Sequence, residues 1–176
     1  RWVPFDLETF ELDMEAFEVA VQGASLVGAV HTSNVLGVRN PVEKMIEIAH
    51  RAGAKVLIDA AQAAPHDRIG FDSSGVDFLA LSAHKMGGPT GIGALFINES
   101  VFQQMQPFMG GGDMIREVHF DYSTYQENEH RFEAGTPRIA EAIGWGAAID
   151  WLAKWDVESI HEHGLDLARF TAESLR

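Results

Sequence analysis

The hydrophobic residues of the chain follow two kinds of pattern, one with helical spacing and one in short continuous runs. Met14, Phe17 and Val21 lie on one face of a helix predicted over residues 13–22, and Asp13 can cap its N-terminus. Helical spacing recurs in three later segments: one that begins at residues 40–41 and ends at Gly53, one over about 140–155, and one over 157–175.

Short apolar runs lie between these helices and predict buried strands. They cover residues 25–31, 55–59, 78–82 and 92–98. Strands separated by helices of this length are typical of the α/β class, so we predict three layers, with helices on both faces of a mostly parallel sheet. Ligands bind such sheets at the carboxyl ends of the strands, which selects Asn34, Asp59 and the segment from Ser82 to Lys85. Residues 103–139 show no clear period.

Composition narrows the possible functions. The chain has 176 residues, 46% of them hydrophobic, which indicates one globular domain. Its net charge of −13 would repel nucleic acid and anionic lipid, so we expect neither as a partner. It has no cysteine, which excludes disulfides, thiolate metal sites and a cysteine nucleophile within these residues. His161 and His163 stand two apart on a predicted helix and face different ways, so we expect no metal site.

The ends of the chain indicate a piece of a longer protein. The first residue is Arg1 rather than methionine, and the last predicted helix runs on to the final residues. We expect a cytoplasmic protein, although a targeting segment in the missing part stays open.

Asp59 ends an apolar strand, where an ionised carboxylate requires hydrogen-bond donors or a positive partner. It can form a turn at the end of the strand, or it can be an anion held for a cationic ligand atom such as a protonated pyridine nitrogen. Gln62 follows three residues later and can place an amide near the same ligand, or it can be an ordinary solvated residue of the loop.

The segment Ser82-Ala83-His84-Lys85 carries a hydroxyl, an imidazole and an amine from one strand end into a glycine-rich turn. Each has an ordinary alternative as a cap, a satisfied polar group or a surface lysine. A lysine near a carboxylate-anchored ring can also form a Schiff base, and Ser82 and His84 would then serve a phosphate. The glycines follow the lysine and lead into a strand, which does not match a dinucleotide or P-loop motif.

Six motifs, in order, resemble the class V aminotransferase family of fold-type I pyridoxal-phosphate enzymes, and most closely the group II (SUF-type) cysteine desulfurases. They are the residues His31–Gly37, Asp59–Gln62, Ser82–Lys85, Gly87–Gly93, Gly110–Ile115 and Arg131–Pro137. The last of these motifs resembles group II rather than the other desulfurase group, so the assignment within the family depends on it. The resemblance implies that residues 1–176 are a partial cofactor-binding large domain whose N-terminal segment and C-terminal small domain are missing.

The resemblance implies a pyridoxal 5'-phosphate site built from these residues. Asp59 pairs with the pyridine nitrogen and Gln62 with the ring hydroxyl. Ser82 and His84 bind the phosphate beside Lys85, which is the catalytic lysine that carries the cofactor. These implied roles agree with the chemistry of the residue types at the predicted strand ends.

Two further roles, and the activity, come from the resemblance alone. Thr136 contacts the phosphate across a homodimer interface, and Asn34 holds the substrate carboxylate. The implied reaction converts L-cysteine to L-alanine and passes sulfur to an enzyme cysteine outside this chain, then to an acceptor protein of iron–sulfur cluster assembly. Selenocysteine lyase activity is chemically adjacent. The alternatives are an aminotransferase-like or epimerase-like class V enzyme, or a fragment that is inactive by itself.

Overall fold

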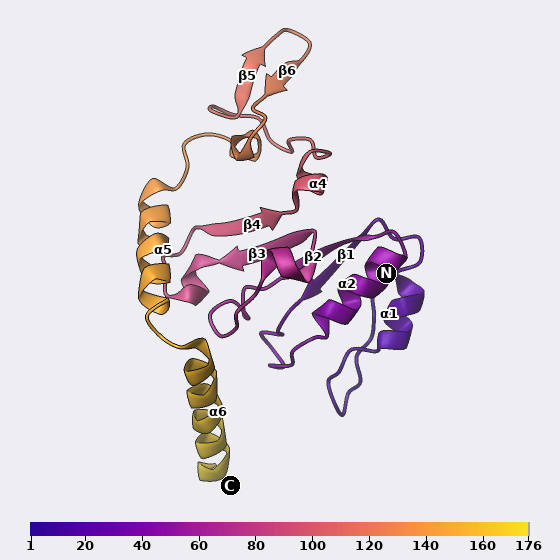
Figure 1. Cartoon of the computed structure of the whole chain (residues 1–176), viewed down its shortest axis with the longest axis vertical. Helices are drawn as coiled ribbons and strands as arrows, with labels where there is room; N and C mark the ends of the chain where they lie inside the picture. The colour runs from indigo at the N-terminus through magenta and orange to yellow at the C-terminus, as the bar shows by residue number, and fades with distance from the viewer. Residues whose placement is uncertain (176) are drawn as a thin grey trace.

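A four-stranded sheet forms the centre of the computed structural model, which describes residues 1–175 (Figure 1). Its strand order is β1-β2-β3-β4. The strands are β1 (Leu26–Val30), β2 (Lys55–Asp59), β3 (Phe78–Ser82) and β4 (Gly93–Ile97). The first three are parallel and β4 runs antiparallel to β3. All four lie within the apolar runs of the sequence, so the predicted mostly parallel sheet is confirmed.

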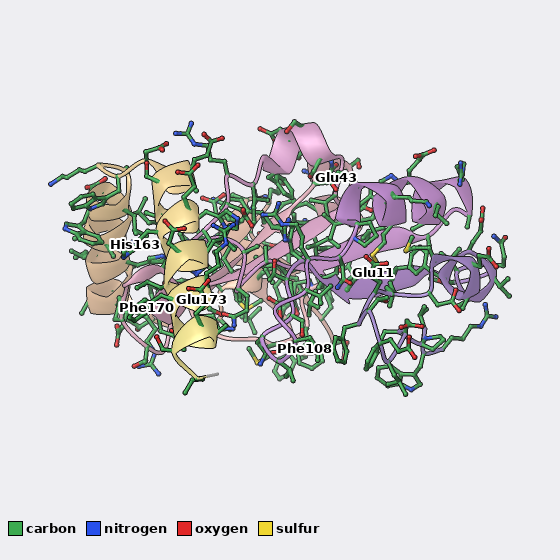
Figure 2. The ribbon with its side chains drawn as sticks, turned by 90° about the horizontal axis from the view of Figure 1, so that it is seen from below. Glu11, Glu43, Phe108, His163, Phe170 and Glu173 are labelled. Carbon is green, nitrogen blue, oxygen red and sulfur yellow. The ribbon has the colours of Figure 1, made fainter. Side chains whose placement is uncertain are left out.

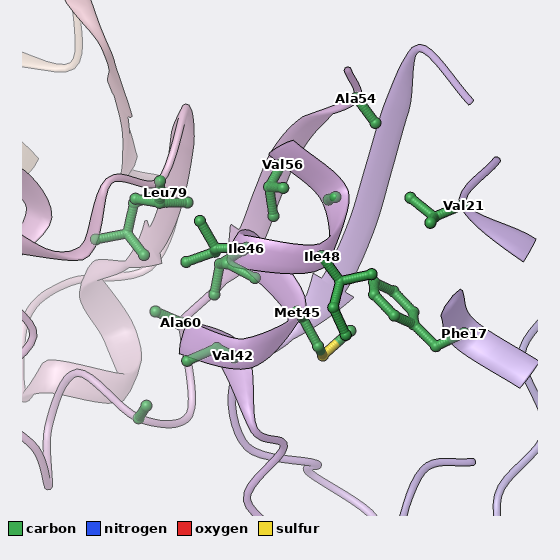
Figure 3. Close-up of a cluster of buried hydrophobic side chains, with 14 residues drawn as sticks. Phe17, Val21, Val42, Met45, Ile46, Ile48, Ala54, Val56, Ala60 and Leu79 are labelled. Atoms are coloured by element: carbon green, nitrogen blue, oxygen red, sulfur yellow. The ribbon is translucent and has the colours of Figure 1, made fainter. Parts of the chain in front are cut away.

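Helices α1 (Met14–Ala20) and α2 (Val42–Arg51) pack on one face of this sheet. Alternate strand residues point to that face, so Val56 and Leu79 join the same buried cluster as the apolar side of α2. Figure 3 shows Met45 and Ile48 of α2 lying close to Phe17 of α1. The short helix α3 (Phe71–Ser74) adds Phe71, whose ring centroid lies 5.7 Å from that of Phe96 in β4.

Asp77 ties α2 to the sheet at the edge opposite the strand carboxyl ends. One of its buried carboxylate oxygens accepts hydrogen bonds from His50 Nε2 and the backbone N–H of Val56, each at 2.8 Å. The other lies 3.0 Å from Lys55 Nζ. Burial by itself raises the pKa of Asp77, but these donors outweigh it and hold the pKa below its ordinary value.

The chain beyond β3 is more extended. The 3₁₀ helix η1 (Ala83–Met86) leads into β4, and the elements that follow are α4 (Glu99–Phe102), β5 (Ile115–Val118), β6 (Ser123–Tyr125), η2 (Glu129–Phe132), α5 (Ile139–Leu152) and α6 (Val157–Ser174). We call the four-stranded sheet with helices α1 to α3 the body of the structure. The antiparallel pair β5–β6 projects from the body, and α6 leads away from it (Figure 1). Figure 2 labels His163 and Phe170 on α6, and both side chains are exposed.

The two predicted helices of this region are confirmed, with α5 ending at Leu152 and α6 at Ser174. The final residue, 176, lies outside the described residues. Across residues 1–175, none of the helices combines the length and the apolar character that a bilayer crossing requires.

Candidate functional site

The register of the parallel strands brings three chain segments to one edge of the sheet. Val30 pairs with Asp59, and Asp59 pairs with Ala80, two residues before the end of β3 at Ser82. Because β1, β2 and β3 run in the same direction, the loops that follow them all leave at this edge. The predicted gathering of Asp59 and Ser82 at neighbouring strand ends is therefore present in the structure.

Asp59 lies at the end of β2 with an exposed side chain. One carboxylate oxygen accepts a hydrogen bond from the backbone N–H of Ala61 at 2.9 Å, so the turn-forming role is present in the structure. Ala60 and Ala61 are buried in this turn, and Gln62 is half-buried beside them. The turn thus places a carboxylate and an amide at the same strand end, with small residues between them.

Ser82 begins the tight turn that carries His84 and Lys85. The backbone of Ala83, which is fully buried, is fixed on both sides: its N–H donates to Ile92 O at 3.2 Å, and its C=O accepts from Gly88 N at 2.9 Å. Lys85 is half-buried and His84 is exposed. The lysine therefore lies in a closed backbone loop rather than on a fully solvated surface.

His31, the residue that follows β1, is buried. Its backbone N–H donates to Asp59 O at 2.8 Å, and its Nδ1 lies 3.1 Å from Thr32 Oγ1. Burial lowers the pKa of His31, and the charge of Arg39 lowers it further. Asn34 lies in the loop that follows and is exposed. The sequence predicts a buried strand over residues 25–31, and the burial of His31 agrees with that prediction for its last residue.

Thr136 lies on a different segment, exposed between η2 and α5. Arg131 anchors that segment: it donates to the carbonyl of Phe102, and its guanidinium lies 4.3 Å from the centre of the Phe102 ring and 4.9 Å from that of Phe132. Through Arg131, the segment that contains Thr136 is held against Phe102 of α4 rather than against the strand ends. In one copy of the chain, the structure does not place Thr136 with Asp59 and Lys85.

Trp145 of α5 packs behind the turn that carries Lys85, and sequence analysis did not single it out. It is the one buried residue of α5 within the described residues, at 9% exposure. A Cβ added at Gly88 would lie 3.0 Å from Trp145 Cδ1, so the indole lies directly against that turn. The available signal was weak, since α5 is apolar around most of its circumference.

Comparison with known proteins relates the whole chain to one family. The family model described as aminotransferase class-V matches residues 1–176. A probable cysteine desulfurase of Synechocystis sp. is 46% identical over 176 residues, covering 99% of this chain and 42% of the relative. A cysteine desulfurase of Haloferax volcanii is 40% identical over 165 residues, covering 93% of this chain and 39% of the relative. The chain thus spans about two fifths of the length of these curated relatives.

Solved structures match the fold equally well. The apo cysteine desulfurase of Thermococcus onnurineus superposes with a TM-score of 0.92 at 39% identity, over 99% of this chain and 44% of that one. An Escherichia coli cysteine desulfurase also gives 0.92, at 34% identity, over 98% of this chain and 43% of that one. These matches confirm the predicted fold class.

Proposed function

The chain belongs to the aminotransferase class-V family, and from this premise we propose that it carries the pyridoxal-phosphate site of a cysteine desulfurase. One observation supports the site above all others. Parallel pairing places Asp59 on the strand next to the one that ends at Ser82 and continues to Lys85. Relatives described as cysteine desulfurases, 46% and 40% identical to this chain, support the choice of reaction within the family.

The residues at the strand ends fit this cofactor by their chemistry. A carboxylate suits a protonated ring nitrogen, an amine suits an aldehyde, and a hydroxyl and an imidazole suit a phosphate. Asp59, Lys85, Ser82 and His84 supply these groups at adjacent strand ends. The small side chains of Ala60 and Ala61 favour the close approach of a flat ring, and Gln62 would donate to its hydroxyl.

When bound, pyridoxal phosphate supplies an electron sink for the bond that breaks at the Cα atom of the substrate. Asp59 would keep the proton on the ring nitrogen, because an ionised carboxylate stabilises the cation beside it. The amine of Lys85 would bind the aldehyde carbon and, once released by the substrate amine, take the proton from the substrate Cα. Ser82 and His84 would hold the phosphate, which fixes the cofactor relative to Lys85.

The remaining roles complete the proposal. Asn34, in the loop after β1, would donate to the carboxylate of the amino-acid substrate. Thr136 would reach the phosphate of a second copy of the chain in a homodimer, which agrees with its place on a separately anchored segment. These residues include no cysteine, so the thiol that takes the sulfur would belong to another part of the protein. The sulfur would then pass to an acceptor protein of cytoplasmic iron–sulfur cluster assembly.

Absorbance tests the cofactor site. Protein produced from its natural reading frame should gain a visible absorbance band on addition of pyridoxal phosphate, and Lys85→Ala should abolish the band. Lys44→Ala is the matched control, because Lys44 is an exposed lysine on α2. A band that persists in Lys85→Ala would refute the assignment of this lysine.

Product analysis tests the reaction. The loaded protein should release alanine from cysteine with one sulfur taken up for each alanine, and a parallel assay with selenocysteine tests the lyase activity. A protein that binds the cofactor through Lys85 but forms no alanine from cysteine would be a different class V enzyme.

A further inference from the structure

Helix α5 touches the rest of the chain along one narrow stripe, and Trp145 lies at its centre. The residues of the helix that are buried or half-buried recur at helical spacing; they are Glu141, Gly144, Trp145, Ala148 and Leu152. The stripe faces η1, the turn that contains His84 and Lys85. The body therefore holds α5 mainly through contacts behind the proposed cofactor lysine.

The stripe packs against Gly88 and Pro89 of the turn. At Gly88, an added Cβ would lie 3.0 Å from Trp145 Cδ1 and 2.9 Å from Ala83 O, so no larger residue fits between the indole and the turn. One residue further along, a Cβ added at Gly144 would lie 3.5 Å from Pro89 Cγ. Helix and turn thus meet at two pairs of residues, Trp145 with Gly88 and Gly144 with Pro89, and a glycine in each pair allows the close approach.

Gly88 is also the residue that closes the turn. Its backbone N–H donates to Ala83 O at 2.9 Å, so His84 and Lys85 lie inside the loop that this bond completes. Without the ring, the space beside Gly88 would allow this bond to lengthen, and the direction in which the Lys85 side chain leaves the backbone would then change.

The indole N–H gives a further indication. Trp145 Nε1 is buried and has no hydrogen-bond acceptor within the described residues. An unsatisfied buried donor destabilises a folded protein. The ring is present despite this cost, which indicates that its shape matters here rather than its hydrogen bond.

We propose that Trp145 is a positioning residue for Lys85: its ring braces the Gly88 end of the turn and holds the lysine amine where the cofactor aldehyde binds. The proposal rests on the proposed function, since it requires Lys85 to be the cofactor lysine. Trp145 acts through the turn and does not itself touch the reacting atoms.

Replacement of the ring should separate positioning from folding. In Trp145→Ala we expect kcat for alanine formation to fall by about 100-fold, as for a reacting group displaced by about 1 Å, with KM little changed. The pH at which the visible cofactor band titrates should shift as well. Trp145→Phe removes no hydrogen bond and keeps an aromatic ring, so it should restore most of kcat and the native titration. Trp151→Ala, an exposed tryptophan of the same helix at 55%, is the control.

The outcomes distinguish this proposal from the proposed function. If Lys85→Ala loses the band but Trp145→Ala has native kcat and a native titration, the positioning role is wrong and the cofactor site stands. If Trp145→Phe is as impaired as Trp145→Ala, bracing by an aromatic ring is wrong. Should Trp145→Ala not fold, Trp145→Leu gives the test, because it keeps an apolar side chain but lacks the flat ring. Native kcat and a native titration of the cofactor band in Trp145→Leu would refute bracing by the ring.

Discussion

The body around α2 and the region beyond η1 differ in how they bury their apolar side chains. Most of the buried hydrophobic residues lie between Phe17 and Ala83, in a single cluster of α1, α2 and the sheet. After Met86, the buried hydrophobic residues of the described chain are Val101, Met114 and Trp145. The first region thus forms its own core, while the second has little core of its own.

The second region instead exposes large apolar side chains. Phe120, at the tip of the β5–β6 hairpin, is fully exposed, and Ile143 and Trp151 of α5 are 70% and 55% exposed. Helices that are apolar all round are typical of protein interiors. Surfaces of this kind favour contact with other protein, which agrees with the homodimer proposed above. A helical pattern therefore predicts the element, but it does not say which molecule covers its faces.

The sharpest test of this difference is the same substitution in both regions. Ile58→Ala in β2 removes a side chain that is 2% exposed within the core cluster, and we expect the free energy of unfolding to fall by about 4 kcal/mol. Ile143→Ala in α5 removes a side chain that is 70% exposed, and the expected change is within about 0.5 kcal/mol. Urea unfolding followed by circular dichroism measures both. Equal losses would mean that α5 is buried in solution, as in a dimer.

A smaller loss of unfolding free energy is expected when the polar contacts of Asp77 are removed. Asp77→Ala removes the acceptor of His50, Lys55 and the Val56 N–H, which leaves a buried donor unsatisfied. We expect a loss of about 3 kcal/mol, at the low end for a broken buried ion pair, because His50 and Lys55 are partly exposed. The control is Asp72→Ala, an exposed aspartate of α3, which should change stability by less than about 0.5 kcal/mol.

Acid should have a related effect through Asp77. Its pKa is lower in the folded chain than in the unfolded chain, so its stabilising contribution is complete above pH 4 or so and is lost as the pH falls through the folded value. Unfolding measured from pH 6 down to 2 should show this acid-dependent loss. The same dependence in Asp77→Asn would contradict the assignment.

The sequence predicted the body more closely than the second region for a physical reason. Residues 55–59 and 78–82 are apolar runs that end at a polar residue, and both became strands with those bounds. The β5–β6 hairpin was missed because its strands are short and a register shift between Ile115 and Glu117 breaks the alternation of apolar and polar residues. Local pattern therefore predicts the strands whose apolar side chains reach the core, such as Val56, Ile58 and Leu79.

The candidate site divides in the same way. Asp59 and Ser82 could be placed together because parallel strands end at one edge of the sheet. Trp145 could not be connected to the turn of Lys85, because it packs against Gly88, 57 positions earlier in the chain, and such a contact leaves no local pattern. Only the family resemblance suggested Thr136, and the contacts of Arg131 keep it with α4.

The smallest expected effect concerns His31, where the site meets the core. Burial and Arg39 hold its pKa below the ordinary value, against the opposing charges of Asp67 and Glu43. The unfolded chain therefore binds a proton more readily than the folded chain, and stability should fall as the pH drops below about 6.5. The slope for one proton is at most about 1.4 kcal/mol per pH unit.

Substitution of His31 should remove that slope. His31→Gln should flatten the dependence of unfolding free energy on pH between 7 and 5, whereas His163→Gln, on the exposed surface of α6, should leave it unchanged.

Because His31 contacts Thr32 and precedes the loop of Asn34, protonation should loosen the predicted substrate-binding loop first. Hydrogen exchange of residues 32–39 as the pH is lowered measures this. Exchange that rises equally throughout the body would show that the acid effect does not originate at His31.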